Sequence, residues 1–143
     1  MSAENVQVLR DADAALSRQD IAAALAAFDP SIEWNVPDSL PFGGIYHGHD
    51  AVVGFFGTLA EVWQSLSVEP EEFIDAGDTV VVLARDRAIG AGGTFDDRTV
   101  HLWRMRDGKA VSFTEFLDTA KSLQAFGLAP QAGAAGPTHV PWS

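Results

Sequence analysis

The sequence predicts an α+β fold in which helices come first and antiparallel strands come last. Helical periodicity dominates residues 3–66, whereas strand patterns dominate residues 68–117. This order is typical of α+β proteins and not of doubly wound parallel sheets. A strongly bent antiparallel sheet that wraps over helices leaves a hollow where the two diverge. We therefore expect an internal pocket, a favoured site for small molecules in small domains.

The composition limits the size, the partners and the location of the protein. The 143 residues suffice for one domain but not for two comfortable ones. Nine Lys and Arg against twenty Asp and Glu give a net charge of −11, which argues against nucleic acid or an anionic membrane as partner. The absence of cysteine excludes disulfides, thiolate metal sites and a cysteine nucleophile. Without a membrane-spanning apolar run or a secretory signal at the N-terminus, we expect a cytoplasmic protein.

Two helices are predicted at the start of the chain. Residues 3–18 show a 3/4 spacing on one face, formed by Val6, Leu9, Asp13 and Leu16. Asp20 is a suitable N-cap for a second, shorter helix that carries Phe28 and that Pro30 stops.

The middle of the chain contains the longest predicted helix. Residues 31–36 alternate as a strand, and residues 37–48 form a loop rich in Pro and Gly. Residues 50–66 carry a wide apolar stripe, so this helix should lie against a sheet. Residues 68–74 form a strand that Pro70 interrupts.

A long strand and a hairpin follow. Residues 79–89 are the clearest strand, and a glycine-rich bend at residues 90–93 leads into the hairpin. The strongest hairpin signal is the turn Asp107-Gly108. Asp118 is placed to cap a final helix that Gly127 ends.

The C-terminal segment is rich in Ala, Gly and Pro. We expect one domain over residues 1–127 and a tail over residues 128–143. Pro141-Trp142 either fold over the pocket or a partner subunit as a lid, or fray as termini usually do, and we favour the frayed tail.

The functional hypothesis centres on His101 and Glu115. His101 and Trp103 fall on the covered face of their strand if Arg104 points outward. Glu115 falls in register with the apolar residues of the next strand, and such a break in the pattern marks functional or strained sites. Burial raises the pKa of a carboxyl, and imidazole titrates near neutrality. The pair is therefore suited to removing a proton α to a carbonyl and returning it elsewhere.

The segment Arg85-Asp86-Arg87 leaves two orientations open. If the arginines face the pocket, Arg85 would bind an anionic or carbonyl-bearing ligand through its fork of donors. If Asp86 faces the pocket, it supplies a second acid/base carboxylate. We favour the inward arginines and keep both Arg85 and Asp86 as candidates. In the purely structural alternative, Glu115 forms a salt bridge with Arg85 or Arg87 and only closes the sheet.

Aromatic residues supply the expected core and part of the pocket wall. The candidates for ligand contact are Trp34, Tyr46, Phe55, Trp103 and Phe113. The hydroxyl of Tyr46 either donates to a developing oxyanion or reaches solvent at a loop edge. The pair His47 and His49 lacks a third clustered ligand, so we expect a surface turn and no metal site.

Three runs of the sequence resemble a known family. The runs LPFGGIYHGHDAVVGFF, DAGDTVVVLAR and HLWRMRDGKAVSFTEFLDTAKSLQAFG are similar to the SnoaL-like branch of the nuclear transport factor 2-like superfamily, over roughly residues 4–127. The resemblance implies a cone-shaped α+β barrel with a pocket open at one end, often dimerised through the sheet. Its relatives include ketosteroid isomerases, polyketide cyclases, limonene-type epoxide hydrolases, dehydratases and binding modules, so the fold alone does not assign an activity.

The chain departs from two of these relatives. The epoxide hydrolases resemble a pattern of Arg-x-Asp on the middle strand with a second Asp on the last strand. Here the middle strand offers Arg85-Asp86-Arg87, and the last strand carries Glu115. The tyrosine and protonated aspartate of the ketosteroid isomerases have no clear counterparts.

We therefore expect a cofactor-independent enzyme that acts on a small hydrophobic, carbonyl-bearing or polycyclic molecule. Glu115 and His101 would exchange protons, and Arg85 or Tyr46 would polarise an oxygen. Isomerisation, cyclisation and dehydration all fit. The alternatives are a non-catalytic module that binds a hydrophobic ligand or a partner protein, and an epoxide hydrolase. A homodimer is the expected assembly.

Overall fold

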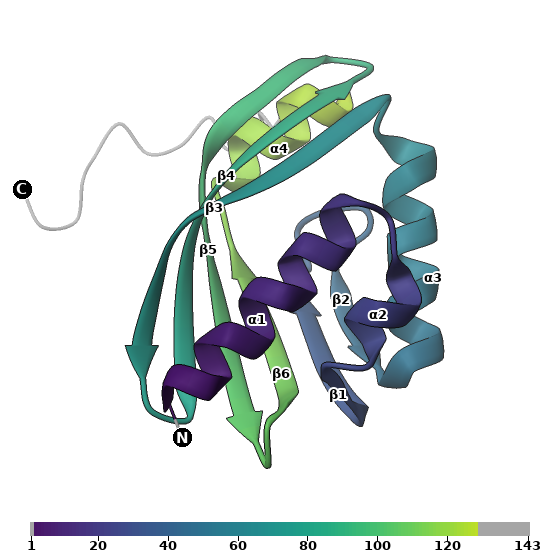
Figure 1. Cartoon of the computed structure of the whole chain (residues 1–143). Coiled ribbons are helices and arrows are strands. Elements are labelled where there is room, and N and C mark those ends of the chain that lie inside the picture. Colours follow the sequence, from purple (N-terminus) through teal and green to yellow (C-terminus); the bar gives the residue numbers. More distant parts are fainter. Residues whose placement is uncertain (1, 129–143) are drawn as a thin grey trace, which may run out of the picture.

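A curved six-stranded sheet forms the centre of the fold (Figure 1). The structure, a computed structural model, describes residues 2–128. The strands lie in the order β2-β1-β6-β5-β4-β3. Their bounds are β1 Phe28–Val36, β2 Gly44–His47, β3 Ser65–Ala76, β4 Thr79–Gly90, β5 Gly93–Arg106 and β6 Lys109–Phe116. The α+β class and the curved sheet with helices over it are as predicted.

One pairing in the sheet is parallel. Strand β1 runs parallel to β6, whereas the other four neighbouring pairs are antiparallel. The sheet is therefore mixed, because the two helices at the N-terminus deliver β1 to the free edge of β6 in the parallel sense. The central strand β6 gains hydrogen-bonded neighbours on both sides from this pairing.

Four helices accompany the sheet: α1 Ser2–Ser17, α2 Ile21–Leu25, α3 Gly48–Val62 and α4 Thr119–Phe126. Helix α3 packs on β1 and β2, and α4 packs on β4 and β5. Two predicted caps are confirmed, since Asp20 accepts a hydrogen bond from the backbone N–H of Ala23 and Asp118 accepts one from that of Lys121. None of the helices in the described part of the chain is long and apolar enough to cross a membrane.

The predicted hairpin turn joins β5 to β6. Asp107 and Gly108 both have positive φ, at 52° and 75°, which is the backbone of a type I′ turn. Such a turn twists with the strands that it connects. It places His101 directly opposite Glu115 in the antiparallel ladder.

Three boundaries differ from the prediction. Phe28 and Pro30 belong to β1, because the second helix ends at Leu25 and the chain is extended from Phe28 onward. The segment predicted as a loop contains the short strand β2, which pairs with β1. Helix α3 ends at Val62, so Leu66 lies in β3.

Helix α1 lies across the sheet and packs on β3 (Figure 1). Near its start, the side-chain amide of Asn5 donates to the carbonyl of Gly77 in the β3–β4 turn, at 3.2 Å. One turn later, the guanidinium of Arg10 lies 4.4 Å from the ring centre of Phe73 on β3. These two contacts fix the direction in which the helix runs, from the β3–β4 turn toward the start of β3.

Aromatic side chains fill the space between the sheet and the helices. Trp34 stacks on Phe113, with ring centres 3.9 Å apart, and Trp103 lies 4.7 Å from Phe113. All three are buried, as are Phe28 and Phe55. These aromatic side chains form a large part of the core. Burial of each one stabilises the folded state by roughly 1.5–3 kcal/mol.

Candidate functional site

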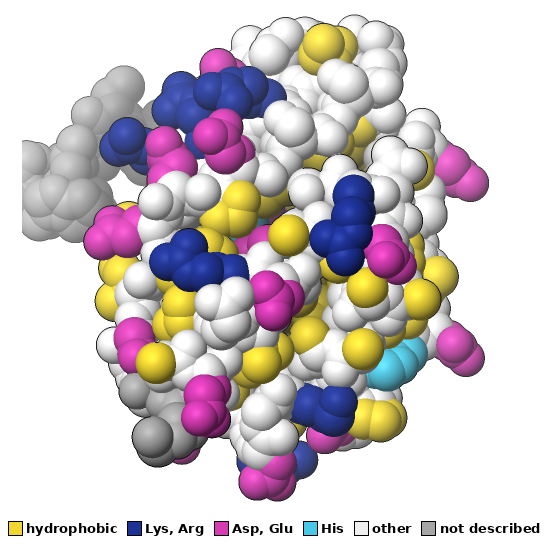
Figure 2. Space-filling view, viewed as in Figure 1, with side chains coloured by type: hydrophobic (Ala, Val, Ile, Leu, Met, Phe, Trp, Pro, Cys, Tyr) yellow, Lys and Arg dark blue, Asp and Glu magenta, His cyan; other side chains and the backbone are white. Residues whose placement is uncertain are grey.

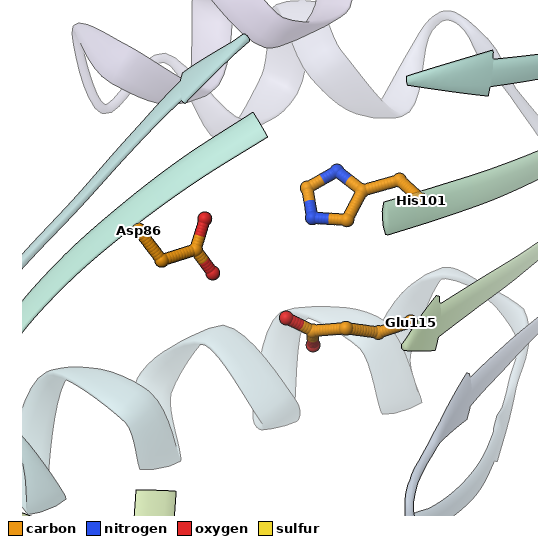
Figure 3. Close-up of side chains that lie close together, drawn as sticks. All are labelled: Asp86, His101 and Glu115. Atoms are coloured by element: carbon orange, nitrogen blue, oxygen red, sulfur yellow. The ribbon is translucent and has the colours of Figure 1, made fainter. Parts of the chain in front are cut away.

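Three ionisable side chains from adjacent strands meet inside the molecule (Figure 3). Asp86 comes from β4, His101 from β5 and Glu115 from β6, and one donor atom of each lies within 4.8 Å of the others. Period-two alternation places them together, since all three follow the apolar set that faces the helices. We call these residues the trio.

The trio is desolvated. Asp86 and His101 are each 6% exposed, and Glu115 is half-buried as a residue while its carboxyl group is removed from water. None of the described arginines and lysines forms an ion pair with any member. The salt bridge from Glu115 to Arg85 or Arg87 is thus not formed.

Burial and mutual repulsion separate the pKa values of the three groups. Burial raises the pKa of Glu115 to about 8, and the nearby charge of Asp86 adds to this effect. Burial also raises the pKa of Asp86 to about 6, against a hydrogen bond from Thr99 that lowers it. Burial lowers the pKa of His101 to about 4. At neutral pH, Asp86 is thus mainly ionised, Glu115 mainly protonated and His101 neutral.

Thr99 connects two members of the trio. Its hydroxyl donates to Oδ1 of Asp86 at 3.1 Å and lies 3.4 Å from Nε2 of His101. Since its single proton goes to Asp86, the hydroxyl oxygen is left to accept from Nε2–H of His101. This assignment leaves Nδ1 of His101 as an unprotonated acceptor, and that buried atom has no partner.

Asp13 is a functional candidate that the sequence reasoning missed. Burial raises its pKa to about 7, with a further contribution from the charge of Asp86, and its Oδ2 is buried without a hydrogen-bond partner. A signal was present in the sequence, because Asp13 continues the core-facing spacing of Val6, Leu9 and Leu16. An acid at such a position breaks the helical pattern as Glu115 breaks that of its strand.

The inward orientation of the arginines is wrong. Asp86 is buried, whereas Arg85 and Arg87 lie on the opposite face of β4. Arg85 donates to Asp96 at 2.9 Å, and Arg87 contacts Glu69 at 3.3 Å. Acidic partners on β3 and β5 hold both guanidinium groups outside, so Arg85 does not reach the trio.

Tyr46 is also corrected as an oxyanion donor. Its hydroxyl donates to the carbonyl of Phe42 at 2.7 Å, which commits its only proton. Its ring packs 4.9 Å from that of Phe55, as part of the core near β2. It therefore neither donates to a ligand in this arrangement nor simply points to solvent.

The predicted aromatic wall is close to the trio. Phe113 lies 5.2 Å from the ring of His101, and Trp34 and Trp103 pack on Phe113. The indole N–H groups of Trp34 and Trp103 are buried and have no partner. Phe55 packs against Trp34, with ring centres 6.3 Å apart, and so reaches His101 only through other rings.

Apolar side chains border the trio on the side of β3. Val68 lies directly opposite Asp86 in the antiparallel ladder, and Leu66 lies opposite Ala88, so both share the inner face with Asp86. They remain 38% and 40% exposed. Figure 2 shows this face, where apolar side chains surround small patches of acidic and histidine colour near its middle. The edge of the sheet beside Asp86 is thus an accessible apolar rim.

The trio also has the ligand types and spacing that a divalent cation needs. It offers two carboxylate oxygens and one imidazole nitrogen. A cation would bind the deprotonated carboxylates and compete with their protons. His49, considered above with His47 as a metal pair, instead makes a hydrogen bond to the backbone. Its Nε2 lies 2.9 Å from the carbonyl oxygen of Phe28.

Comparisons with known proteins agree with this architecture. The model of the SnoaL-like domain matches residues 9–113. An uncharacterized protein of Mycobacterium tuberculosis is 28% identical over 124 residues, which cover 85% of this chain and 95% of the relative. A nuclear transport factor 2-like protein of unknown function from Burkholderia pseudomallei is 33% identical, with a TM-score of 0.81 over 87% of this chain and 98% of the other.

A second similar structure was obtained by co-crystallisation with a small molecule. TerC, co-crystallised with polyporic acid, is 29% identical, with a TM-score of 0.81 over 86% of this chain and 98% of that chain. The family match covers most of the chain, and the curved sheet with its covering helices is the architecture of the nuclear transport factor 2-like relatives. The chain belongs to the SnoaL-like domain family.

Proposed function

We propose that the protein is a cofactor-independent enzyme that applies general acid–base catalysis to a neutral, largely apolar molecule with a carbonyl group. The observation that carries this proposal is the trio, in which groups with separated pKa values face one another in an apolar interior. Isomerisation, cyclisation and dehydration all need such a set, because each moves a proton next to a carbonyl.

The pKa order assigns the roles. Asp86, ionised at neutral pH, removes a proton from the carbon next to the carbonyl. Glu115, protonated at neutral pH, donates to the carbonyl oxygen and stabilises the enol. Neutral His101 offers Nδ1 as an acceptor that orients a hydroxyl of the substrate. Such general acid–base catalysis contributes about 10²- to 10⁴-fold to a rate.

The unpaired polar atoms around the trio support a ligand there. Among the described side chains, the buried polar atoms without a partner are Oδ2 of Asp13, Nε1 of Trp34, Nδ1 of His101 and Nε1 of Trp103. Each belongs to the trio, to the aromatic wall beside it, or to a group that interacts with Asp86. Because buried polar groups are rarely left unpaired, their gathering in one region favours a bound polar molecule or water.

The surroundings of the trio suggest the substrate class. The aromatic wall suits a flat carbon skeleton, and the apolar rim of Leu66 and Val68 offers a path to Asp86. The trio contains acids and no cation, which favours neutral molecules over anions. Polyporic acid, with which the relative TerC was co-crystallised, shares the oxygen-bearing aromatic skeleton but, being an acid, not the neutral charge.

Hydrogen exchange tests the proposal before a natural substrate is known. The α-protons of 2-tetralone, a neutral apolar ketone, exchange with deuterium oxide when a base removes them. We expect the protein to accelerate this exchange in NMR spectra, and Asp86→Asn and Glu115→Gln to lose 100-fold or more of the acceleration. Asp11→Asn, which alters an exposed acid of α1, should behave as the wild type.

Retention of exchange by both variants would remove the trio from the chemistry. If the wild type binds 2-tetralone, as followed by quenching of tryptophan fluorescence, and promotes neither this exchange nor epoxide opening, a non-catalytic binding module becomes the better assignment.

Epoxide hydrolysis is the second candidate, because Asp86 faces the interior. It forms a carboxylate pair with Glu115, and such a pair is needed to hold and activate a water molecule. No arginine joins the pair, since Arg85 and Arg87 are held outside. Opening of limonene oxide by the wild type, with loss in Asp86→Asn, would select this activity.

A further inference from the structure

Helix α1 brings a fourth ionisable group to the trio. The helix follows β3 from Asn5 at the β3–β4 turn to Arg10 over Phe73. Asp13 lies almost one turn farther along the same direction. There its carboxyl is close enough to Asp86 for the two charges to interact. Asp13 therefore brings a carboxyl group from the helix layer within electrostatic reach of Asp86 on the sheet.

The carboxyl of Asp13 has no structural partner. Its Oδ2 is buried and unpaired, although its neighbours Leu9 and Ala12 are packed in the core. An apolar residue would suit this position better, because an unpaired buried polar group costs roughly 1–3 kcal/mol. A residue that destabilises the fold without forming a structural interaction is typical of functional sites.

Asp13 is still protonated at the pH at which Asp86, the proposed base, becomes ionised. The groups that face it are Asp86 on β4 and, beyond Asp86, His101 on β5 and Glu115 on β6, and none of the described cations pairs with these groups. Asp86 ionises first, with a pKa of about 6, and its charge helps to raise the pKa of Asp13 to about 7. Asp13 can thus donate a hydrogen bond while Asp86 acts as the base.

We propose that Asp13 is a further catalytic residue, which donates a hydrogen bond from α1 to the oxygen of the substrate. This inference rests on the proposed function. Asp86 takes the proton from carbon, the electron pair of that C–H bond forms the C=C bond of the enolate, and the π pair of the carbonyl moves to the oxygen. Asp13 and Glu115 share the charge that develops on the oxygen through hydrogen bonds. The proton on Asp86 exchanges with solvent, Asp86 then delivers a solvent-derived proton to carbon, and Asp13 remains protonated as the hydrogen-bond donor.

Two substitutions test whether the side chain of Asp13 acts as a hydrogen-bond donor or only fills space. Asp13→Asn keeps an N–H donor of similar shape, whereas Asp13→Ala removes the donor. Exchange of 2-tetralone should stay within about fivefold of the wild type in Asp13→Asn and fall by about 10²-fold in Asp13→Ala, mainly in kcat. Asp11→Asn is the matched control, because Asp11 lies on the exposed side of the same helix.

The pH profile gives a readout that a structural role would not move. In the wild type, activity should fall as the pH rises past 7, because Asp13 loses its proton. In Asp13→Asn this decline should disappear, leaving only the later decline near pH 8 from Glu115. Circular dichroism establishes that each variant is folded, and the profile of Asp13→Asn decides the matter even if Asp13→Ala does not fold.

The outcomes distinguish the two proposals. If Asp86→Asn and Glu115→Gln lose exchange while Asp13→Ala retains it, or if Asp13→Asn keeps the decline near pH 7, the role of Asp13 is refuted and the acid–base proposal stands. If Asp86→Asn and Glu115→Gln both retain exchange, the acid–base proposal itself is refuted.

Discussion

Thr99 is the residue through which the ionisation of Asp86 is adjusted. Its hydroxyl is fully buried, and its hydrogen bond lowers the pKa of Asp86 against the effect of burial. The same oxygen lies near Nε2 of His101. One neutral side chain thus influences both the ionisation of Asp86 and the tautomer of the imidazole of His101.

Replacing Thr99 with valine should raise the pKa of Asp86 further. Valine has a similar volume but no hydroxyl, so the ionised carboxylate of Asp86 loses a hydrogen-bond donor. The acidic limb of the pH–activity profile should therefore move to higher pH. At pH 5.5 we expect roughly a fivefold loss of 2-tetralone exchange, which corresponds to about 1 kcal/mol. A pH–rate profile measures the change. Thr79→Val, which removes a hydroxyl on the exterior near Arg104, is the control. An acid limb that stays in place would contradict the role of Thr99.

At the residue scale, the sequence predicted some of the site and missed the rest. His101 was predicted because it continues the covered face of a clearly alternating strand. Glu115 was predicted because it places an acid in the apolar set of the next strand. The orientation of Asp86 was not predictable in the same way, because β4 carries apolar residues at both parities. Ion pairs with Asp96 and Glu69 on neighbouring strands decide that orientation. Such partners become known only when the strands are paired.

At the scale of elements, the predictions succeeded where the signal was local. The turn Asp107-Gly108 and the caps Asp20 and Asp118 depend on backbone geometry within a few residues. Strand β2 depends instead on distant pairing. It has four residues, two of which are exposed, and it is extended because β1 offers a free edge.

Gly92 joins the β4–β5 bend to the end of α4. A Cβ atom built there would overlap the carbonyl oxygen of Gln124 and lie 2.7 Å from Cα of Gly127. Both are backbone atoms, and the N–H of Gly92 also donates to the carbonyl of Ala125 at 3.0 Å. The bend and the helix therefore approach as closely as two backbones can.

The variant Gly92→Ala should lose roughly 1–3 kcal/mol of unfolding free energy, because the backbones must separate. Gly54→Ala is the control, since its Cβ would meet nothing within 4 Å in α3. That variant should gain up to about 1 kcal/mol. Urea denaturation compares them. Equal stability of the two variants would show that α4 does not dock on the bend.

At the scale of the whole molecule, the buried acids link stability to pH. Asp13, Asp86 and Glu115 have pKa values of about 7, 6 and 8 in the folded protein, against about 4 when unfolded. The folded state thus holds more protons between these limits, so its stability falls as the pH rises. His101 acts in the opposite sense, but only between its folded value of about 4 and its unfolded value of 6.5.

We therefore expect the free energy of unfolding to fall between pH 6.5 and pH 8, by roughly 1–3 kcal/mol at most, since Asp13 and Glu115 are only half-buried as residues. Urea denaturation at the two pH values measures the change. Glu115→Gln should reduce the dependence, because the amide carries no proton to lose. A stability that rises over this interval would contradict the burial of the acids.

The assembly of the protein stays a prediction. A homodimer would cover some of the exposed apolar side chains, of which Ile45 and Phe116 are the most exposed, at 61% and 53%.

The parallel pairing of β1 with β6 has a consequence for how the protein folds. Trp34 and Phe113 are neighbours in this ladder, although 78 intervening residues separate them along the chain. A contact of such long range closes a large loop and slows folding. During synthesis on a ribosome, the strand that carries Glu115 emerges late and must find an early segment that has waited without its partner. The trio is thus among the last regions of a nascent molecule to take shape.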